Sequence, residues 1–201
     1  MKFYITIFFV AILLATSSKA QKSNAPSVQY GVKTGVNFSD IKFSDNGTSE
    51  TASGTGFLAG FYAALPMGNT FKIQPELFYN NINGKMDEET LNLNYLSLSV
   101  LPKYVFNSTG FSILAGPQIG FLLSAKNTDN GVTENVESYF KSTDFSLVVG
   151  AEYSFPGGFN FSARYNAGLA NVFKGIDITY NPTVKLSAFT IALGYSFGKS
   201  K

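Results

Sequence analysis

Six charged residues of this sequence occupy equivalent positions in segments where apolar and polar residues alternate. They are Lys33, Lys72, Glu76, Lys103, Glu152 and Arg164. Carboxylates beside ammonium and guanidinium groups can form ion pairs that fill a space, or line a polar passage for ions. The chain has no histidine and no cysteine, which excludes Ser-His-Asp and Cys-His catalysis and imidazole or thiolate metal sites. We therefore expect no catalytic residues, no cofactor, no metal site and no enzymatic activity.

The densest acidic cluster is Asp87-Glu88-Glu89. It lies in a polar stretch between two alternating segments, where a run of like charge is typically the solvated surface of a loop. A weak divalent-cation site is the alternative interpretation.

The elements that would position the charges are eight alternating segments. Side chains of a strand point alternately to its two faces, and each segment is close to the roughly 9–11 residues of a tilted membrane strand. They are Tyr30–Phe38, Gly56–Leu65, Thr70–Asn80, Asn94–Phe106, Gly110–Leu123, Thr143–Phe155, Phe159–Leu169 and Ser187–Phe197. The pattern predicts an all-β fold, an eight-stranded antiparallel up-and-down transmembrane β-barrel, with apolar residues facing lipid and a polar lumen.

The connections between these segments alternate strictly in length. Three are tight (Pro66–Asn69, Asn107–Thr109 and Pro156–Gly158), and four are long and polar (Ser39–Thr55, Asn81–Leu93, Ser124–Ser142 and Ala170–Leu186). Bacterial outer-membrane barrels have short periplasmic turns and longer extracellular loops. We therefore expect a multi-pass protein of the outer membrane with both termini periplasmic. Aromatic residues near both ends of the segments predict two interfacial girdles.

The main alternative is a soluble eight-stranded barrel with an apolar calyx, similar to a lipocalin. Alternation alone does not say which face is outside. Only 14% of the residues are charged, and few of them lie on the polar face of the segments. A wall exposed to water normally carries far more charge, so the composition favours the membrane.

The N-terminus is typical of a secretory signal. Lys2 precedes the apolar run Phe3–Ala15, and Ser18-Lys19-Ala20 supplies a small-x-small cleavage site. We expect residues 1–20 to be a cleavable signal peptide and residues 21–201 to form the barrel domain. Removing Lys2 and Lys19 from the 15 basic residues balances the 13 acidic ones. The mature chain would be formally neutral, which gives no reason to expect nucleic acid as a partner.

The six charges would lie at two heights of the lumen. Glu76 and Arg164 would lie near mid-height on the third and seventh strands, which face each other, and the other four would form a net-positive layer towards the periplasm. An eight-stranded barrel is just wide enough for side chains to fill. We therefore expect a packed salt-bridge plug, with a polar passage or gate as the alternative.

Three prolines lie inside predicted strands, namely Pro75, Pro102 and Pro117. Each lacks a ladder donor, and all three belong to the lipid-facing set. We expect local bulges or missing hydrogen bonds at these positions.

Several strings of the sequence resemble the PorT-like family of small outer-membrane β-barrels. They are QPELFY (74–79), NYLSLSVLPKYVF (94–106), LAGPQIGFLLSAK (114–126), DFSLVVGAEY (144–153), ARYNAGLANV (163–172) and ALGYSF (192–197). The resemblance implies an eight-stranded barrel assembled by the outer-membrane insertion machinery. The named member of the family is associated with export through the type IX secretion system. The resemblance implies no catalytic residues.

The expected function is therefore that of an outer-membrane barrel with a filled lumen and a structural or interaction role. The resemblance adds a role accessory to protein secretion. The alternative is a narrow outer-membrane channel for small solutes or ions. Expected partners are the lipid bilayer and envelope or secretion proteins that contact the long loops or the periplasmic rim.

Overall fold

The computed structural model describes residues 27–106, 109–174 and 182–197, so the predicted signal peptide, 1–20, lies outside the described residues. Its strands are β1 (Gln29–Asp45), β2 (Thr48–Pro66), β3 (Phe71–Met86), β4 (Glu89–Val105), β5 (Phe111–Asp129), β6 (Val132–Asn135), β7 (Thr143–Ser154), β8 (Phe159–Gly168) and β9 (Thr183–Phe197). A short 3-10 helix, η2, spans Glu137–Tyr139. No helix among these residues is long and apolar enough to cross a bilayer.

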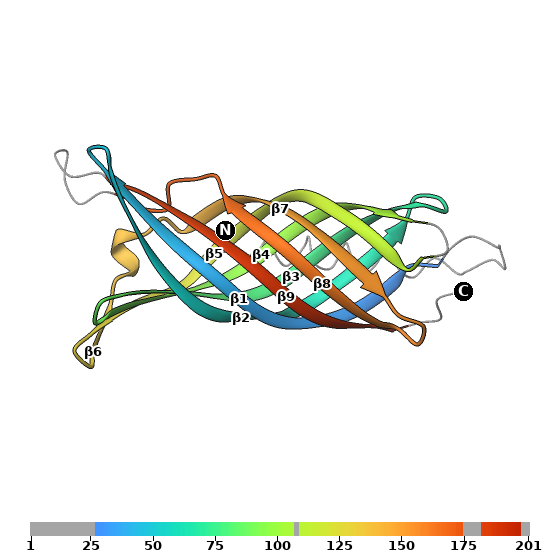
Figure 1. The fold of residues 1–201 in the computed structure, drawn as a ribbon, viewed down its shortest axis with the longest axis horizontal. Coiled ribbons are helices and arrows are strands. Elements are labelled where there is room, and N and C mark those ends of the chain that lie inside the picture. The colour runs from blue at the N-terminus through green and yellow to red at the C-terminus, as the bar shows by residue number, and fades with distance from the viewer. Residues whose placement is uncertain (1–26, 107–108, 175–181, 198–201) are drawn as a thin grey trace, which may run out of the picture.

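Eight of the strands form one closed antiparallel ring. β1 to β5 pair in sequence, β7, β8 and β9 follow, and β9 pairs with β1 to close the barrel. β6 pairs with the end of β5 and extends it as a hairpin (Figure 1). The predicted eight-stranded up-and-down barrel is confirmed.

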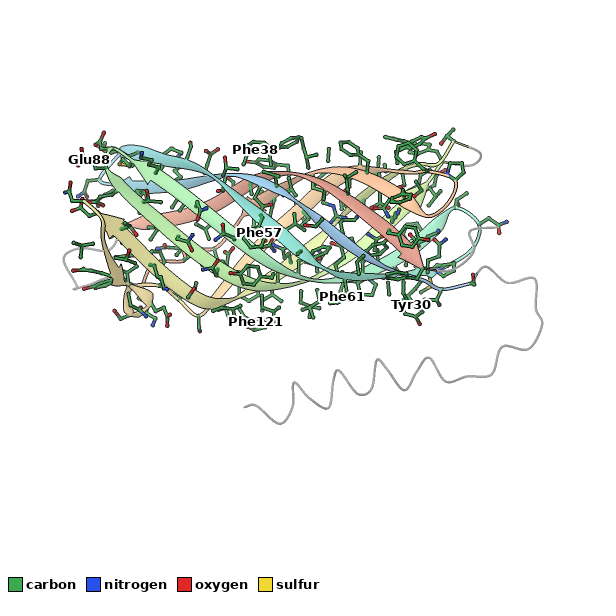
Figure 2. All side chains as sticks on the ribbon, turned by 90° about the horizontal axis from the view of Figure 1, so that it is seen from below. Tyr30, Phe38, Phe57, Phe61, Glu88 and Phe121 are labelled. Carbon is green, nitrogen blue, oxygen red and sulfur yellow. The ribbon has the colours of Figure 1, made fainter. Side chains whose placement is uncertain are left out.

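The apolar set of residues faces outward. Phe38, Phe57 and Phe121 lie on the outer surface at a similar position along the barrel, as Figure 2 shows, and Phe61 is 66% exposed. At the end with the tight turns, aromatic rings contact one another, for example Phe106 and Phe111 at 5.6 Å between centroids. The alternative of a soluble barrel with an apolar calyx is therefore wrong. An outer wall this apolar suits lipid.

Three of the four predicted long loops are wrong in large part, because the strands continue through them. The fourth, Ala170–Leu186, lies partly outside the described residues. β1 and β2 are joined only by Asn46-Gly47, and β3 and β4 only by Asp87-Glu88. Asn46 and Gly47 have φ values of 45° and 85°, the left-handed conformation that two-residue hairpin turns with a matching twist require. β1 has 17 residues, several more than a membrane strand needs, so these hairpins project beyond the bilayer.

Polarity inverts where the strands leave the lipid. On β1, the outward residues change from Val36 and Phe38 to Asp40 and Lys42, while the inward residue Ile41 is fully buried. The same inversion occurs on β3, β4 and β9, where Ile82, Leu93 and Val184 are buried. The barrel is therefore apolar outside within the membrane and apolar inside beyond it. Because of this inversion, the alternation typical of a membrane strand stops at these positions, which is why the sequence pattern predicts loops there.

The prolines interrupt pairing without creating bulges. Between β4 and β5, no residues pair between Ser99↔Gln118 and Lys103↔Leu114, the stretch that contains Pro102 and Pro117. The register is the same on both sides of this gap. The β4–β5 register instead shifts between Asn94 and Tyr95. The β2–β3 ladder has a similar gap between Tyr62↔Glu76 and Leu65↔Ile73, the stretch that contains Pro75, and its register is also unchanged. The expected loss of pairing is therefore confirmed at all three prolines, and the expectation of a bulge there is wrong.

Candidate functional site

Glu152 of β7 lies at the centre of the charged groups in the lumen. Its Oε2 accepts a hydrogen bond from Lys33 Nζ of β1 at 2.6 Å, and its Oε1 accepts one from Lys103 Nζ of β4 at 2.5 Å. All three residues are at most 5% exposed. Because β1, β4 and β7 lie on different sides of the ring, this carboxylate joins three parts of the wall.

Glu76 of β3 and Arg164 of β8 form a second, bidentate ion pair. Arg164 Nη1 and Nη2 donate to the two carboxylate oxygens of Glu76 at 2.6 and 2.9 Å. Such a fork-to-fork arrangement is among the stronger pairings of charged side chains. Arg164 Nη2 also lies 3.7 Å from Glu152 Oε2, so the two ion pairs form one cluster.

Neutral side chains complete the link between the two carboxylates. Gln74 Nε2 donates to Glu76 Oε1 at 2.8 Å and Gln74 Oε1 accepts from Lys103 Nζ at 3.3 Å. Ser99 Oγ donates to Glu76 Oε2. We call the five ionised residues Lys33, Glu76, Lys103, Glu152 and Arg164 the charge network.

Lys72, the sixth candidate, lies outside this network. Its Nζ donates to Gln29 Oε1 at 2.8 Å, and it forms no ion pair with any residue that the structure describes. It lines a cavity of about 500 Å³ at the end with the tight turns, together with Lys103 and Ser196. The hairpins at the opposite end extend well beyond the lipid-facing aromatic residues, and the longer extensions of such barrels are extracellular. We therefore assign this end to the periplasm and call the cavity the periplasmic vestibule.

The buried charges of the network are tolerated in the lumen because each one is paired with a group of opposite charge. It contains three cations and two anions, and a buried charge is strongly unfavourable unless it is paired and hydrogen-bonded. Lys33 also lies over the ring of Tyr62, 5.0 Å from the centroid, where the negative face of the ring attracts a cation. Each cation in the network therefore has a carboxylate within 4 Å.

Sequence reasoning missed Tyr62 and Asn160 beside the network. Tyr62 Oη lies 2.7 Å from Ser196 Oγ and accepts a hydrogen bond from Asn160 Nδ2 at 2.8 Å. Gly31 makes room for the phenol, since a Cβ there would lie 2.4 Å from the Tyr62 ring. The signal available in the sequence was a glycine at an inward position of β1, the strand beside Tyr62.

An apolar cluster fills the lumen beyond the network, on the side of the long hairpins. Its buried members come from six strands and from two segments outside the named strands. They are Ile41, Ala52, Ile82, Leu93, Tyr95, Ala125, Phe140, Val172, Val184 and Leu186. We call this cluster the apolar plug. Leu93 and Val184 are fully buried, so the plug has a dry centre.

A small polar cavity of about 20 Å³ lies where the polar and apolar parts of the lumen meet. It is lined in part by Tyr95, Asp144 and Asn166, each of which has a buried oxygen without a hydrogen-bond partner in the described residues. This volume accommodates about one water molecule, which can satisfy such groups.

The side chains of the charge network and of the apolar plug are engaged in pairing and packing. No cluster of three or more histidine, cysteine, aspartate or glutamate side chains that could hold a metal ion occurs among the described residues. Asp87 and Glu88 form the turn between β3 and β4, and Glu89 is the first residue of β4. Glu88 is seen at the end of the barrel in Figure 2.

Comparison with known families identifies one match. A family model described as outer membrane protein beta-barrel domain matches residues 19–174, which is most of the chain. No curated protein sequence matches this one.

Three solved structures of two proteins illustrate the similarity of fold. Neisserial surface protein A is 13% identical with a TM-score of 0.56, and the alignment covers 86% of this chain and 100% of that one. Ail, the attachment invasion locus protein of Yersinia pestis, is 17% identical with a TM-score of 0.51 and the same coverage. A further structure of Ail contains the heparin analogue sucrose octasulfate; it is 16% identical, with a TM-score of 0.50 and again 86% and 100% coverage. At these identities the likeness shows the fold alone.

Proposed function

Since this chain belongs to the outer membrane protein β-barrel domain family, we propose that it is a closed, membrane-anchored interaction protein that does not conduct solutes. The observation that carries this proposal is the filling of the lumen by two successive layers. The charge network joins β3 to β8 and β7 to β1 and β4. The apolar plug then occupies the lumen beyond it.

The surfaces that remain for partners are the two ends of the barrel. At one end, the hairpins β1–β2 and β3–β4, with β6 and η2, extend beyond the aromatic residues that face lipid (Figures 1 and 2). Their turns carry exposed charged residues such as Asp45 and Glu88. At the other end, the vestibule carries Lys72 and Lys103. Envelope or secretion proteins are the partners that we propose for these ends.

A role accessory to protein secretion is the specific form of this proposal. It rests on the resemblance of the strands to the PorT-like family, whose named member is associated with export through the type IX secretion system. The family model that matches is broader than this group. The proposal includes no catalytic role, because the chain has neither histidine nor cysteine.

A narrow channel for small solutes or ions is the second candidate function. The observation in its favour is the vestibule of about 500 Å³, which reaches Lys103 at the edge of the charge network. A path from there would have to pass both the ion pairs and the plug.

Efflux from liposomes separates the two functions. The purified protein, reconstituted into liposomes loaded with potassium and a small sugar, should release neither faster than protein-free liposomes. Release above that background would overturn the closed-barrel proposal and support the channel. A gel-mobility check that the reconstituted protein is folded makes a negative result interpretable.

In-cell crosslinking tests the interaction role. A photo-crosslinking residue at Glu88 or at Met67 should capture specific proteins at the two ends, whereas the same residue at Val149, which faces lipid and is 51% exposed, should not. If neither end captures more protein than Val149, the chain does not act through its ends.

A further inference from the structure

One sector of the outer wall, on β3, β4 and β5, changes from apolar to polar within one register step. The strand register places outward-facing side chains of the three strands in rows. In order along the barrel, the rows are Leu77–Leu98–Ile119, Tyr79–Leu96–Phe121, Asn81–Asn94–Ser124, Asn83–Asn92–Lys126 and Lys85–Thr90–Thr128. We call the last three rows the polar wall patch. It begins directly beside the aromatic row, where the lipid-facing surface ends.

Four asparagines of the patch form a closed ring of hydrogen bonds. Asn83 donates to Asn81 at 3.0 Å and Asn81 donates to Asn94 at 2.8 Å. Asn94 donates to Asn92 at 2.9 Å, and Asn92 donates to Asn83 at 2.6 Å. The ring is fixed to its surroundings, because Asn94 also accepts from Tyr79 Oη at 2.7 Å and donates to Ser124 Oγ. Such mutual pairing holds the surface rigid.

The patch is basic, and among the described residues its two lysines have no acidic partner. Lys85 and Lys126 are exposed and form no ion pair with any described residue. The three rows contain no aspartate or glutamate. The two lysines are two strands and one row apart, which places their Cα atoms about 12 Å from each other. Their side chains can therefore reach two separate phosphate groups.

We propose that the polar wall patch binds the phosphorylated sugar headgroup of a glycolipid in the outer leaflet. Its lysines would pair with the phosphates, and the partly exposed hydroxyl and amide groups of Asn83, Thr90, Asn92, Asn94 and Thr128 would contact the sugar. Asn81 is buried and only supports the ring. The position supports this occupant, because an aromatic row marks the lipid interface and the headgroups lie immediately beyond it. Charge complementarity supports it as well, since cationic side chains next to a membrane attract anionic lipid groups.

The wall on β1 and β9 provides a matched comparison. There Lys42 lies opposite Lys185, so this sector also has two exposed lysines beyond the aromatic residues. Here Asp40 faces outward on β1 itself, in the row next to Lys42, and accepts a hydrogen bond from Ser53. For the polar wall patch, the same Asp40 is two strands away from Lys85, across Ser53. No asparagine ring lies beside this pair among the described residues. We expect this sector to bind the same headgroup less well.

The test uses the full mature chain in detergent with lipid A, a phosphorylated glucosamine disaccharide lipid, as the probe. Native mass spectrometry counts the lipid bound as its concentration rises. The variants are Lys85→Gln, Lys126→Gln and the combination of the two, and Lys42→Gln with Lys185→Gln as the matched control. All four lysines are exposed, so neither double variant should affect folding, which gel mobility verifies.

The wild type should bind lipid A, and binding should weaken about fivefold for one lysine of the patch and about 30-fold for both. The control variant should retain wild-type binding, and lipid A without its phosphates should bind poorly to every form. Equal binding by the wild type and the patch variant would overturn the proposal. So would a larger loss in the control variant, or undiminished binding of the dephosphorylated lipid.

Discussion

The carboxylate of Glu76 on β3 and the guanidinium of Arg164 on β8 are joined by two hydrogen bonds of 2.6 and 2.9 Å. β3 and β8 are the third and seventh strands of the closed ring, so this pair crosses the full width of the lumen. Both residues are at most 7% exposed. Removal of either charge leaves the other buried without its principal partner.

Substitution of Arg164→Met should lower the free energy of unfolding by about 3–5 kcal/mol, because Glu76 is left buried. The double variant Glu76→Leu with Arg164→Met should lose much less, because no charge of this pair remains. Urea titration in lipid vesicles, with the folded fraction read from gel mobility, measures both. A double variant as unstable as the sum of the single variants would show that the two charges do not interact.

Glu152→Gln should lower the free energy of unfolding more than Lys72→Gln does. The glutamine leaves Lys33 and Lys103 without their shared carboxylate, which should cost several kcal/mol. Lys72→Gln removes a partly buried charge that has one hydrogen bond, to Gln29, and should change stability by less than about 1 kcal/mol. The same unfolding titration compares them. An equal loss of unfolding free energy in the two variants would mean that the ion pairs of Glu152 do not stabilise the barrel more than the single hydrogen bond of Lys72 does.

Leu93→Ala tests the apolar plug. Leu93 is fully buried at the end of the lumen beyond the lipid, so truncation should cost about 2–5 kcal/mol through lost burial and the cavity that remains. Leu123→Ala is the matched control, because Leu123 is 50% exposed, and it should cost under about 1 kcal/mol. Urea midpoints of the two variants measure the difference. If both variants unfold at the wild-type midpoint, the extended end of the barrel is not packed as described.

The membrane-embedded part of the fold could be predicted from the sequence, because there the two faces of each strand differ in kind. Phe111, Ile113 and Phe121 face outward as expected. When one face of a strand meets lipid, a shift of one residue would turn every apolar side chain into the lumen, so the pattern determines which residues face outward. The charged residues of the lumen could be identified by the same parity. The pairing of Glu152 with both Lys33 and Lys103 could not, because it depends on the register of each strand pair, which sets the height of each residue, and on the reach of the lysine side chains.

The hairpins beyond the membrane could not be predicted by the same criterion. Ile41 and Leu93 point inward and polar residues point outward there, the reverse of the membrane part. If one face of a strand is assumed to stay apolar along its whole length, this reversal of polarity looks like the end of the strand. A local signal in the sequence indicates these hairpins. Asn-Gly is a strong indication of a two-residue hairpin turn, and it occurs at Asn46-Gly47 and at Asn130-Gly131. All four residues adopt positive φ values in the structure.

The orientation of the barrel can be tested with single cysteines, because the chain has none of its own. Glu88→Cys lies at the turn between β3 and β4, and Met67→Cys lies at the tight turn after β2, where Met67 is 60% exposed. A membrane-impermeant maleimide added to intact cells should label Glu88→Cys, because the longer hairpins face the exterior. Met67→Cys should be labelled only after the outer membrane is permeabilised. The native chain serves as the blank, and labelling of Met67→Cys in intact cells without labelling of Glu88→Cys would reverse the assigned orientation.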